Sequence, residues 1–111
     1  NTFLNAKSDL TTTDLTTVYT VPSATTAVVK SILVSEDAGS GTTIDVTLVD
    51  ASGTIFSLFK AKAVGSNTTV ELLTQPLILK ESEALKAQAA DANELHVVAS
   101  ILEVKPRQVV T

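Results

Sequence analysis

The sequence predicts an all-β fold: an antiparallel two-sheet β-sandwich of about eight strands, jelly-roll-like, with an extended N-terminal arm. Short segments rich in Thr, Val and Ile recur along the chain, separated by small polar turns at intervals of roughly 8–12 residues. No segment shows a sustained helical period, and no repeat of fixed length is visible. The chain has 111 residues, which suits one domain with a hydrophobic core of its own.

The first predicted strands are defined by alternation and by turn residues. Residues 15–21 alternate and end at Pro22, which lacks the N–H that a ladder needs. Residues 26–34 are apolar at both parities, which predicts a central strand packed on both of its faces. An exposed turn at residues 36–41 follows, because Glu, Asp, Ser and two Gly residues gather there. Residues 43–48 then show the cleanest alternation of apolar and polar side chains.

The middle of the chain continues with turns and strands of the same kind. Residues 50–53 predict a hairpin turn, since their glycine can adopt a positive φ. Residues 54–62 return from this turn as a strand that is apolar on both faces. A turn at residues 65–67 leads to two short strands at residues 68–73 and 77–79, which a proline separates.

Residues 81–92 are the ambiguous segment, because their Ala, Leu, Lys and Gln residues are strong helix formers. Apolar residues at positions 85, 87 and 89 nevertheless alternate with Lys86 and Gln88, and both flanking segments are predicted strands. We therefore predict a strand here. Residues 95–104 form the last predicted strand, with Leu95, Val97, Ala99 and Ile101 on one side and His96, Val98, Ser100 and Leu102 on the other.

These elements divide the chain into an N-terminal arm (residues 1–14), a β-sandwich domain (residues 15–104) and a C-terminal tail (residues 105–111). Residues 1–14 lack a sustained period and would reach roughly 45 Å if fully extended. A frayed terminus is the alternative interpretation of this segment. Its first residues do not resemble a signal peptide, and no apolar run approaches the roughly 20 residues that span a bilayer, so we expect no membrane partner.

Residue types that carry catalysis are scarce. The chain has no Cys, which excludes cysteine–histidine catalysis, and its single His, His96, lies in the middle of a predicted apolar strand. We expect His96 to be a partly buried or interface side chain, since no nucleophile-elbow pattern accompanies it. The sequence therefore predicts a protein that is not an enzyme, with no catalytic residues.

Charge and turn composition also argue against a cofactor or a nucleic acid. The net charge of −4 disfavours a protein that neutralises phosphates, and no basic stripe runs beside aromatic residues. The glycines form no phosphate-binding loop. Glu36, Asp37 and Asp91 would bind Ca²⁺ only if their turns converged, and no ligand spacing of the EF-hand type is present. We expect no metal and no cofactor.

The remaining feature is surface suited to contact with other chains. Thr-rich outward faces, the N-terminal arm and a Val-Val pair near the C-terminus suit a module that packs against copies of itself or in a larger assembly. The candidate partner-contact residues are Phe3, Leu4, Leu10, Val109 and Val110. An ordinary sandwich without such contacts is the alternative.

Several segments resemble small structural modules encoded by tailed bacteriophages. In those modules a Tyr-Thr-Val-Pro strand precedes a Val-Lys-Ser-Ile strand and a small polar turn, as residues 18–22 and 26–34 do here. The similarity continues through residues 69–73, 76–79, 85–89 and 95–103. The resemblance covers residues 15–104 and leaves both termini outside it. It implies a β-sandwich protein of the virion and carries no catalytic signature.

The resemblance leads to a functional hypothesis with two alternatives. The resemblance implies a virion component, and our first hypothesis is a capsid decoration (cement) protein that forms a homotrimer or similar oligomer, contacts the major capsid protein and stabilises the head by bridging capsid subunits. Such a protein would be located in the virion and assembled in the cytoplasm of the bacterial host. A tail, neck or fibre component is the first alternative. A carbohydrate-binding sandwich is the second, although Tyr19, Phe56 and Phe59 are predicted to lie in the core rather than on a sugar platform.

Overall fold

A computed structural model of the chain describes residues 1–105 and confirms the predicted all-β, antiparallel two-sheet sandwich. The described residues contain strands and turns but no helix, so no helix long and apolar enough to cross a membrane occurs among them. Nine strands are present where about eight were expected. They are β1 (Thr2–Leu10), β2 (Thr16–Thr20), β3 (Thr26–Glu36), β4 (Thr42–Val49), β5 (Ile55–Val64), β6 (Thr69–Glu71), β7 (Leu77–Leu79), β8 (Ala84–Ala89) and β9 (Leu95–Val104).

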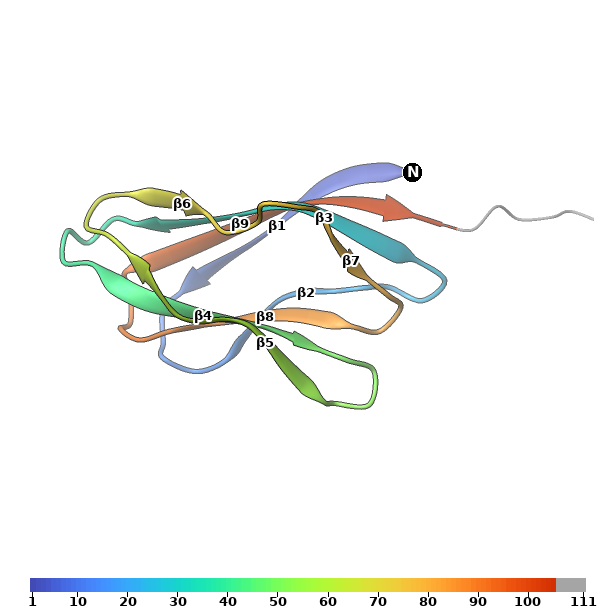
Figure 1. Cartoon of the computed structure of the whole chain (residues 1–111), viewed down its shortest axis with the longest axis horizontal. Helices are drawn as coiled ribbons and strands as arrows, with labels where there is room; N and C mark the ends of the chain where they lie inside the picture. Colours follow the sequence, from blue (N-terminus) through green and yellow to red (C-terminus); the bar gives the residue numbers. More distant parts are fainter. Residues whose placement is uncertain (106–111) are drawn as a thin grey trace, which may run out of the picture.

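The strands form two sheets that face each other (Figure 1). The first sheet has the order β1-β9-β3-β6, with β7 also paired to β3, and the second has the order β2-β8-β4-β5. Pairing is nested along the chain, because β1 pairs with β9, β2 with β8, and β4 with β5. This nesting gives the jelly-roll-like topology and makes most strand contacts distant in sequence.

The segment that we expected to form an N-terminal arm is a β-strand over most of its length. Residues 2–10 form β1, which pairs antiparallel with β9 from Thr2 opposite Glu103 to Leu10 opposite Leu95. The inward positions Leu4, Ala6 and Ser8 are partly buried, and the last one, Leu10, is 1% exposed. The apolar Phe3 on the outward side and the polar Ser8 on the inward side interrupt the alternation that would have predicted this strand.

Strand β3 is central, as predicted, but it does not pack on both of its faces. Ala27 and Val29 are buried at odd positions, whereas Ile32 and Val34 are buried at even positions. A register shift between Val29 and Ser31, opposite β9, accounts for this change of parity. A β-bulge inserts one extra residue in this way and turns the following side chains to the other face. The buried residues Ala27, Val29, Ile32 and Val34 therefore share one inner face, and Val28 and Leu33 lie on the outer face.

The core lies between the sheets and is built from small and branched side chains. Of the two predicted sides of β9, the one that faces this core carries Leu95, Val97, Ala99 and Ile101, all of them buried. The ambiguous segment forms β8, as predicted, because Leu85, Ala87 and Ala89 point into the same core. One polar bridge crosses between the sheets, where the Tyr19 hydroxyl donates to Glu103 Oε2 at 2.6 Å.

Candidate functional site

The acidic turn after β3 is organised around a buried carboxylate rather than exposed throughout. Glu36 is 2% exposed and accepts backbone N–H bonds of 3.0–3.2 Å from Gly39, Ser40 and Gly41 in its own loop and from Asn67 in the next. The Asn67 N–H, followed by those of Gly39 and Gly41, lowers the pKa of Glu36 to about 2 against the opposing effect of burial. The carboxylate therefore accepts hydrogen bonds from the backbone of two loops and has a structural role.

The acids expected to gather around Ca²⁺ are used in the same way. The Thr42 hydroxyl donates to Asp91 at 2.6 Å, and the Ser40 hydroxyl donates to Glu94. Asp37 lies instead beside the ring of His96. Among residues 1–105, no group of three or more His, Cys, Asp or Glu side chains is arranged to hold a metal ion.

His96 lies on the outer side of β9 between two carboxylates. Its Nε2 is 3.3 Å from Asp9 of β1 and its Nδ1 is 3.5 Å from Asp37 of the β3–β4 loop. A serine triad needs one ring nitrogen on a hydroxyl and the other on a carboxylate. Both nitrogens of His96 face acids, so this geometry is not that of a triad. The half-exposed ring instead links the end of β1 to the β3–β4 loop.

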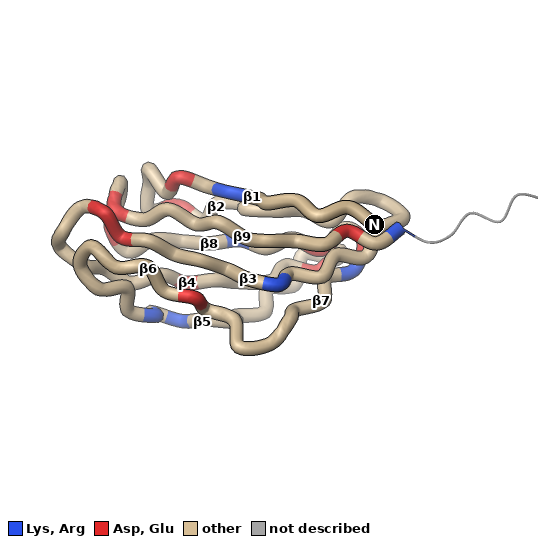
Figure 2. The backbone as a smooth tube through the Cα atoms, turned by 90° about the horizontal axis from the view of Figure 1, so that it is seen from above, with Lys and Arg blue, Asp and Glu red and all other residues tan. Residues whose placement is uncertain are grey.

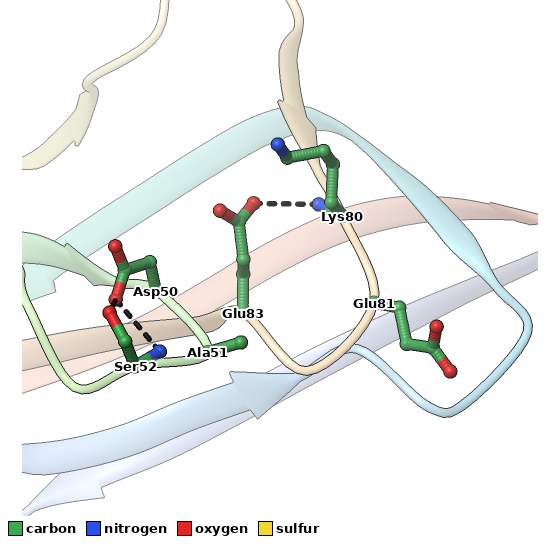
Figure 3. Close-up of a pocket in the computed structure, with 6 residues that line it drawn as sticks. All are labelled: Asp50, Ala51, Ser52, Lys80, Glu81 and Glu83. Atoms are coloured by element: carbon green, nitrogen blue, oxygen red, sulfur yellow. Dashed lines mark hydrogen bonds between the residues drawn. The ribbon is translucent and has the colours of Figure 1, made fainter.

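A shallow hollow at the opposite end of the sandwich gathers one lysine and three acids (Figure 3). Asp50 accepts bonds from the hydroxyl of Ser52 and from its N–H, and these help to lower the pKa of Asp50. Glu83 accepts from the Lys80 N–H at 2.7 Å, and Glu81 accepts from the Ala24 N–H. These carboxylates stabilise the turns around the hollow. Figure 3 shows the hydrogen bonds of Asp50 with Ser52 and of Glu83 with Lys80, each within its own turn.

The outer face of the first sheet carries four apolar side chains in one cross-strand line. Phe3 of β1 lies opposite Leu102 of β9, Leu102 opposite Val28 of β3, and Val28 opposite Ile78 of β7. Directly opposed side chains on one face have Cβ atoms about 4.5–5.5 Å apart, so each member of this line is in reach of the next. Phe3 is 74% exposed and Ile78 is 54% exposed. We refer to Phe3, Leu102, Val28 and Ile78 as the apolar row.

A second line on the same face is apolar only in its middle. Lys7, Val98, Leu33 and Glu71 lie opposite one another across β1, β9, β3 and β6. Figure 2 views this sheet from above, with β1, β9, β3 and β6 in that order. The face thus combines an apolar row at one end with a charged rim of opposite signs at its two sides.

The outer face of the second sheet is polar in its middle and carries a shorter apolar line, Ala84, Val49 and Ile55, across three strands at one end. The middle line across β2, β8, β4 and β5 consists of Thr17, Lys86, Thr47 and Ser57. Contiguous apolar side chains on an outer face are a feature of contact sites, whereas polar outer faces are solvated. The first sheet therefore provides the candidate contact surface.

The structure separates the candidate partner-contact residues from one another. Phe3 is in the apolar row, Leu4 is partly buried against the core, and Leu10 is buried in the core. Leu10 is therefore a stabilising residue and offers no surface to a partner. Val109 and Val110 lie outside the described residues. Sequence reasoning missed Val28, Ile78 and Leu102, since only the strand register brings them beside Phe3.

Comparison with known proteins shows a similarity in fold alone. No protein-family profile matches the sequence, and no curated protein matches it significantly. Two solved structures of a pentameric capsid protein isolated from metagenomic phage sequences match 93% of this chain, with 19% identity and a TM-score of 0.50. This chain spans 63% and 60% of the length of those two chains. A family 22 carbohydrate-binding module of Clostridium thermocellum covers 82% of this chain and 60% of its own at 21% identity, with a TM-score of 0.31 that supports no argument.

Proposed function

We propose that this chain is a non-enzymatic structural protein of a bacteriophage virion. The apolar row on the outer face of the first sheet is the observation that carries the proposal, because it offers a surface for contact rather than for chemistry. The fold shared with a pentameric phage capsid protein and the sequence resemblance to phage structural modules both support it.

Within the virion, capsid decoration is the role that we propose. A decoration protein works by burying its surface against neighbouring subunits, including the major capsid protein. Complete burial of a Phe or Ile side chain contributes roughly 1.5–3 kcal/mol. The exposed Phe3 and Ile78 therefore provide a substantial contact without any rearrangement of the fold.

We also propose that the chain forms a homo-oligomer. Our hypothesis from the sequence is a trimer, whereas the structural neighbour is described as pentameric. Native mass spectrometry of the purified protein distinguishes these two stoichiometries. A protein that stays monomeric at every accessible concentration, in isolation and on particles, would contradict this part of the proposal.

The location on the particle is tested by labelling. Virions of the phage that encodes the chain are purified, and the chain is detected by mass spectrometry and by gold-labelled antibody in electron micrographs. Label over the whole head is expected for a decoration protein. Label at one vertex or along the tail would replace decoration by the tail, neck or fibre alternative, and absence from virions would overturn the proposal.

The contact surface is tested by a matched pair of variants. We expect Phe3→Ser to weaken binding to heads that lack the protein, because it removes the most exposed member of the apolar row. Phe56→Ser is the control, since Phe56 is also an exposed aromatic residue (51%) but belongs to the second sheet. Equal binding by the two variants would move the contact away from the apolar row.

A further inference from the structure

Three of the four sheet edges in the described part of the chain carry features that discourage pairing with another chain. β2 has five residues and a register shift between Thr17 and Tyr19. β5 has two register shifts, two exposed lysines and a positive φ at Ala61. β6 and β7 have three residues each, with Pro76 between them. Short strands, bulges, lysines and prolines are the usual means by which proteins protect an edge.

The fourth edge, β1, is long and regular, although it carries one lysine, Lys7. Its nine residues pair with β9 in continuous register, and it contains no proline. In Figure 2 it runs along the border of the sheet, with β9 on its inner side. A long regular edge of this kind is a template for another extended strand.

The backbone of β1 shows which residues face the free edge. The Leu10 carbonyl accepts from Asn93 in the β8–β9 loop, so it points toward β9. Successive carbonyls of an extended strand point to opposite edges. Those of Asp9, Lys7, Asn5 and Phe3 therefore point away from β9, although the Asp9 carbonyl already accepts from the Thr11 N–H at 2.9 Å. Ser8 occupies a position without outward hydrogen-bonding groups.

We propose that β1 binds the β1 strand of a second copy of this chain, in antiparallel pairing about a two-fold axis through Ser8. The pairing extends the first sheet across two molecules. Each β1 is already extended and ordered on β9, so the pairing needs a backbone adjustment only at Asp9, whose carbonyl must be shared with the Thr11 N–H or released by it.

The charges of β1 select this register. A two-fold axis normal to the sheet must oppose residues whose side chains lie on the same face. It is therefore centred on one residue, which lies opposite the same residue of the other copy. An axis through Ser8 opposes Lys7 of each copy to Asp9 of the other, whereas an axis through Lys7 opposes the two lysines. An axis through Ala6 opposes Phe3 to Asp9. Opposite charges directly across strands stabilise pairing, and like charges destabilise it.

The same register is compatible with the inner face. It opposes Ser8 to itself and Ala6 to Leu10, so no charge is buried between the two sandwiches. A ladder of residues 6–10 is short and buries less than the roughly 1,200 Å² of a standard specific interface. We therefore expect a weak dimer that forms at high protein concentration or where an assembly holds copies together. The proposal does not depend on a virion role.

A chain without cysteine allows the register to be trapped. Opposed residues at a position without hydrogen bonds have Cα atoms about 4.5 Å apart, within the range that a disulfide spans. We expect Ser8→Cys to form a disulfide-linked dimer several times faster than Ala6→Cys, the control for the neighbouring register. Ser66→Cys, in the exposed β5–β6 turn, gives the rate of random collision. A Ser8→Cys rate no higher than either control would overturn the proposal.

Charge reversal provides an independent test in the cysteine-free chain. We expect Lys7→Asp and Asp9→Lys each to reduce dimer formation in sedimentation velocity, because each opposes like charges across the axis. The double variant K7D/D9K restores opposite charges and is expected to recover the dimer. Loss of the dimer in the double variant, with circular dichroism of a folded protein, would overturn the charge pairing and with it the proposed register.

Discussion

Glu36 joins two loops of the sandwich through one carboxylate. Its oxygens accept N–H groups from residues 39–41, which follow β3, and from Asn67, which follows β5. Gly39 and Gly41 adopt φ values of +84° and +71°, a conformation that presents successive N–H groups to one acceptor and that other residues rarely adopt. This network fixes the end of the molecule where His96 and Asp37 also lie.

Replacement of this carboxylate should destabilise the protein. Glu36→Gln exchanges one acceptor oxygen for a donor amide, which cannot accept the N–H groups that face it. We expect the variant to unfold several degrees below the native chain in differential scanning calorimetry. Asp14→Asn is the control, because it neutralises an exposed acid in the β1–β2 loop and should leave the midpoint unchanged. Equal midpoints for both variants would contradict the structural role of Glu36.

The low pKa of Glu36 also predicts how stability depends on pH. The pKa is about 2 in the folded protein against an ordinary value of 4.5, so the unfolded chain takes up a proton first as the pH falls. The contribution of Glu36 to the free energy of unfolding is therefore complete above pH 4.5 and lost between 4.5 and 2. Asp50 acts in the same direction, since the Ser52 hydroxyl lowers its pKa.

Calorimetry across this pH range checks the assignment. The native chain should lose stability steeply below pH 4.5, and Glu36→Gln should show a shallower loss because its side chain does not titrate. The same dependence of stability on pH in both proteins would show that other acids control the loss of stability at low pH.

At the level of elements, the bulge in β3 determines which side chains are buried. Val29 and Ile32 are both in the core, although three positions apart, because Lys30 is the extra residue between two registers with β9. The bulge also places Ser31 and Ile32 where the Glu71 carboxylate accepts from both. The strand therefore changes phase in its middle while retaining both of its neighbours.

Deletion of Lys30 should be tolerated. Without it, Val29 and Ser31 become consecutive and the inward positions 27, 29, 32 and 34 follow regular alternation, so the ladder with β9 continues without a bulge. We expect cooperative thermal unfolding, followed by circular dichroism. Deletion of Leu33 is the control, because it turns Val34 or Ile32 out of the core and should abolish the transition. Loss of folding in both deletions would assign an essential role to the bulge.

Strand β8 shows how tertiary structure overrides local propensity. The segment 84–90 is built from helix formers, yet β8 pairs with both β2 and β4 in the second sheet. Ala87 and Ala89 are buried opposite Val46 and Ile44, where larger inward side chains on β4 fill the space. The strict alternation of polar and apolar residues carried more information here than the preference of each residue.

At the scale of the whole molecule, the nested topology makes the two ends of the chain interdependent. β1 and β9 come from opposite ends of the sequence and pair over nine positions. β1 covers the edge of β9 and contributes Leu10 to the core, with Leu4 and Ala6 packed against it. The N-terminal segment is therefore part of the folded domain.

Removal of residues 1–10 should prevent stable folding and not merely remove a contact. Truncation of one buried Leu costs about 2–5 kcal/mol, a large part of a typical stability of about 5–15 kcal/mol, and this deletion also exposes β9. We expect an aggregated or unfolded product by size-exclusion chromatography and circular dichroism. Phe3→Ser is the control that alters the surface and should remain folded. A folded, monomeric deletion variant would contradict the role of β1.

The sequence by itself determined the all-β class, most strand positions, which residues of β9 share a side and the scarcity of catalytic side chains. Each of these follows from alternation or composition, which are local properties of the chain. The tertiary structure alone decided that β1 joins the sheet, that β3 changes phase at a bulge, and that Glu36 is buried by donors from two loops.

The candidate contact surface could be predicted only in part from the sequence. Phe3 was recognisable as an apolar residue in a polar segment, but Val28, Leu102 and Ile78 could be placed beside it only through the register of four strands. Register depends on pairing between residues that are far apart in sequence, and a shift of one residue turns every side chain to the other face. For this reason the residues of the apolar row were visible in the sequence, whereas their arrangement as one surface required the fold.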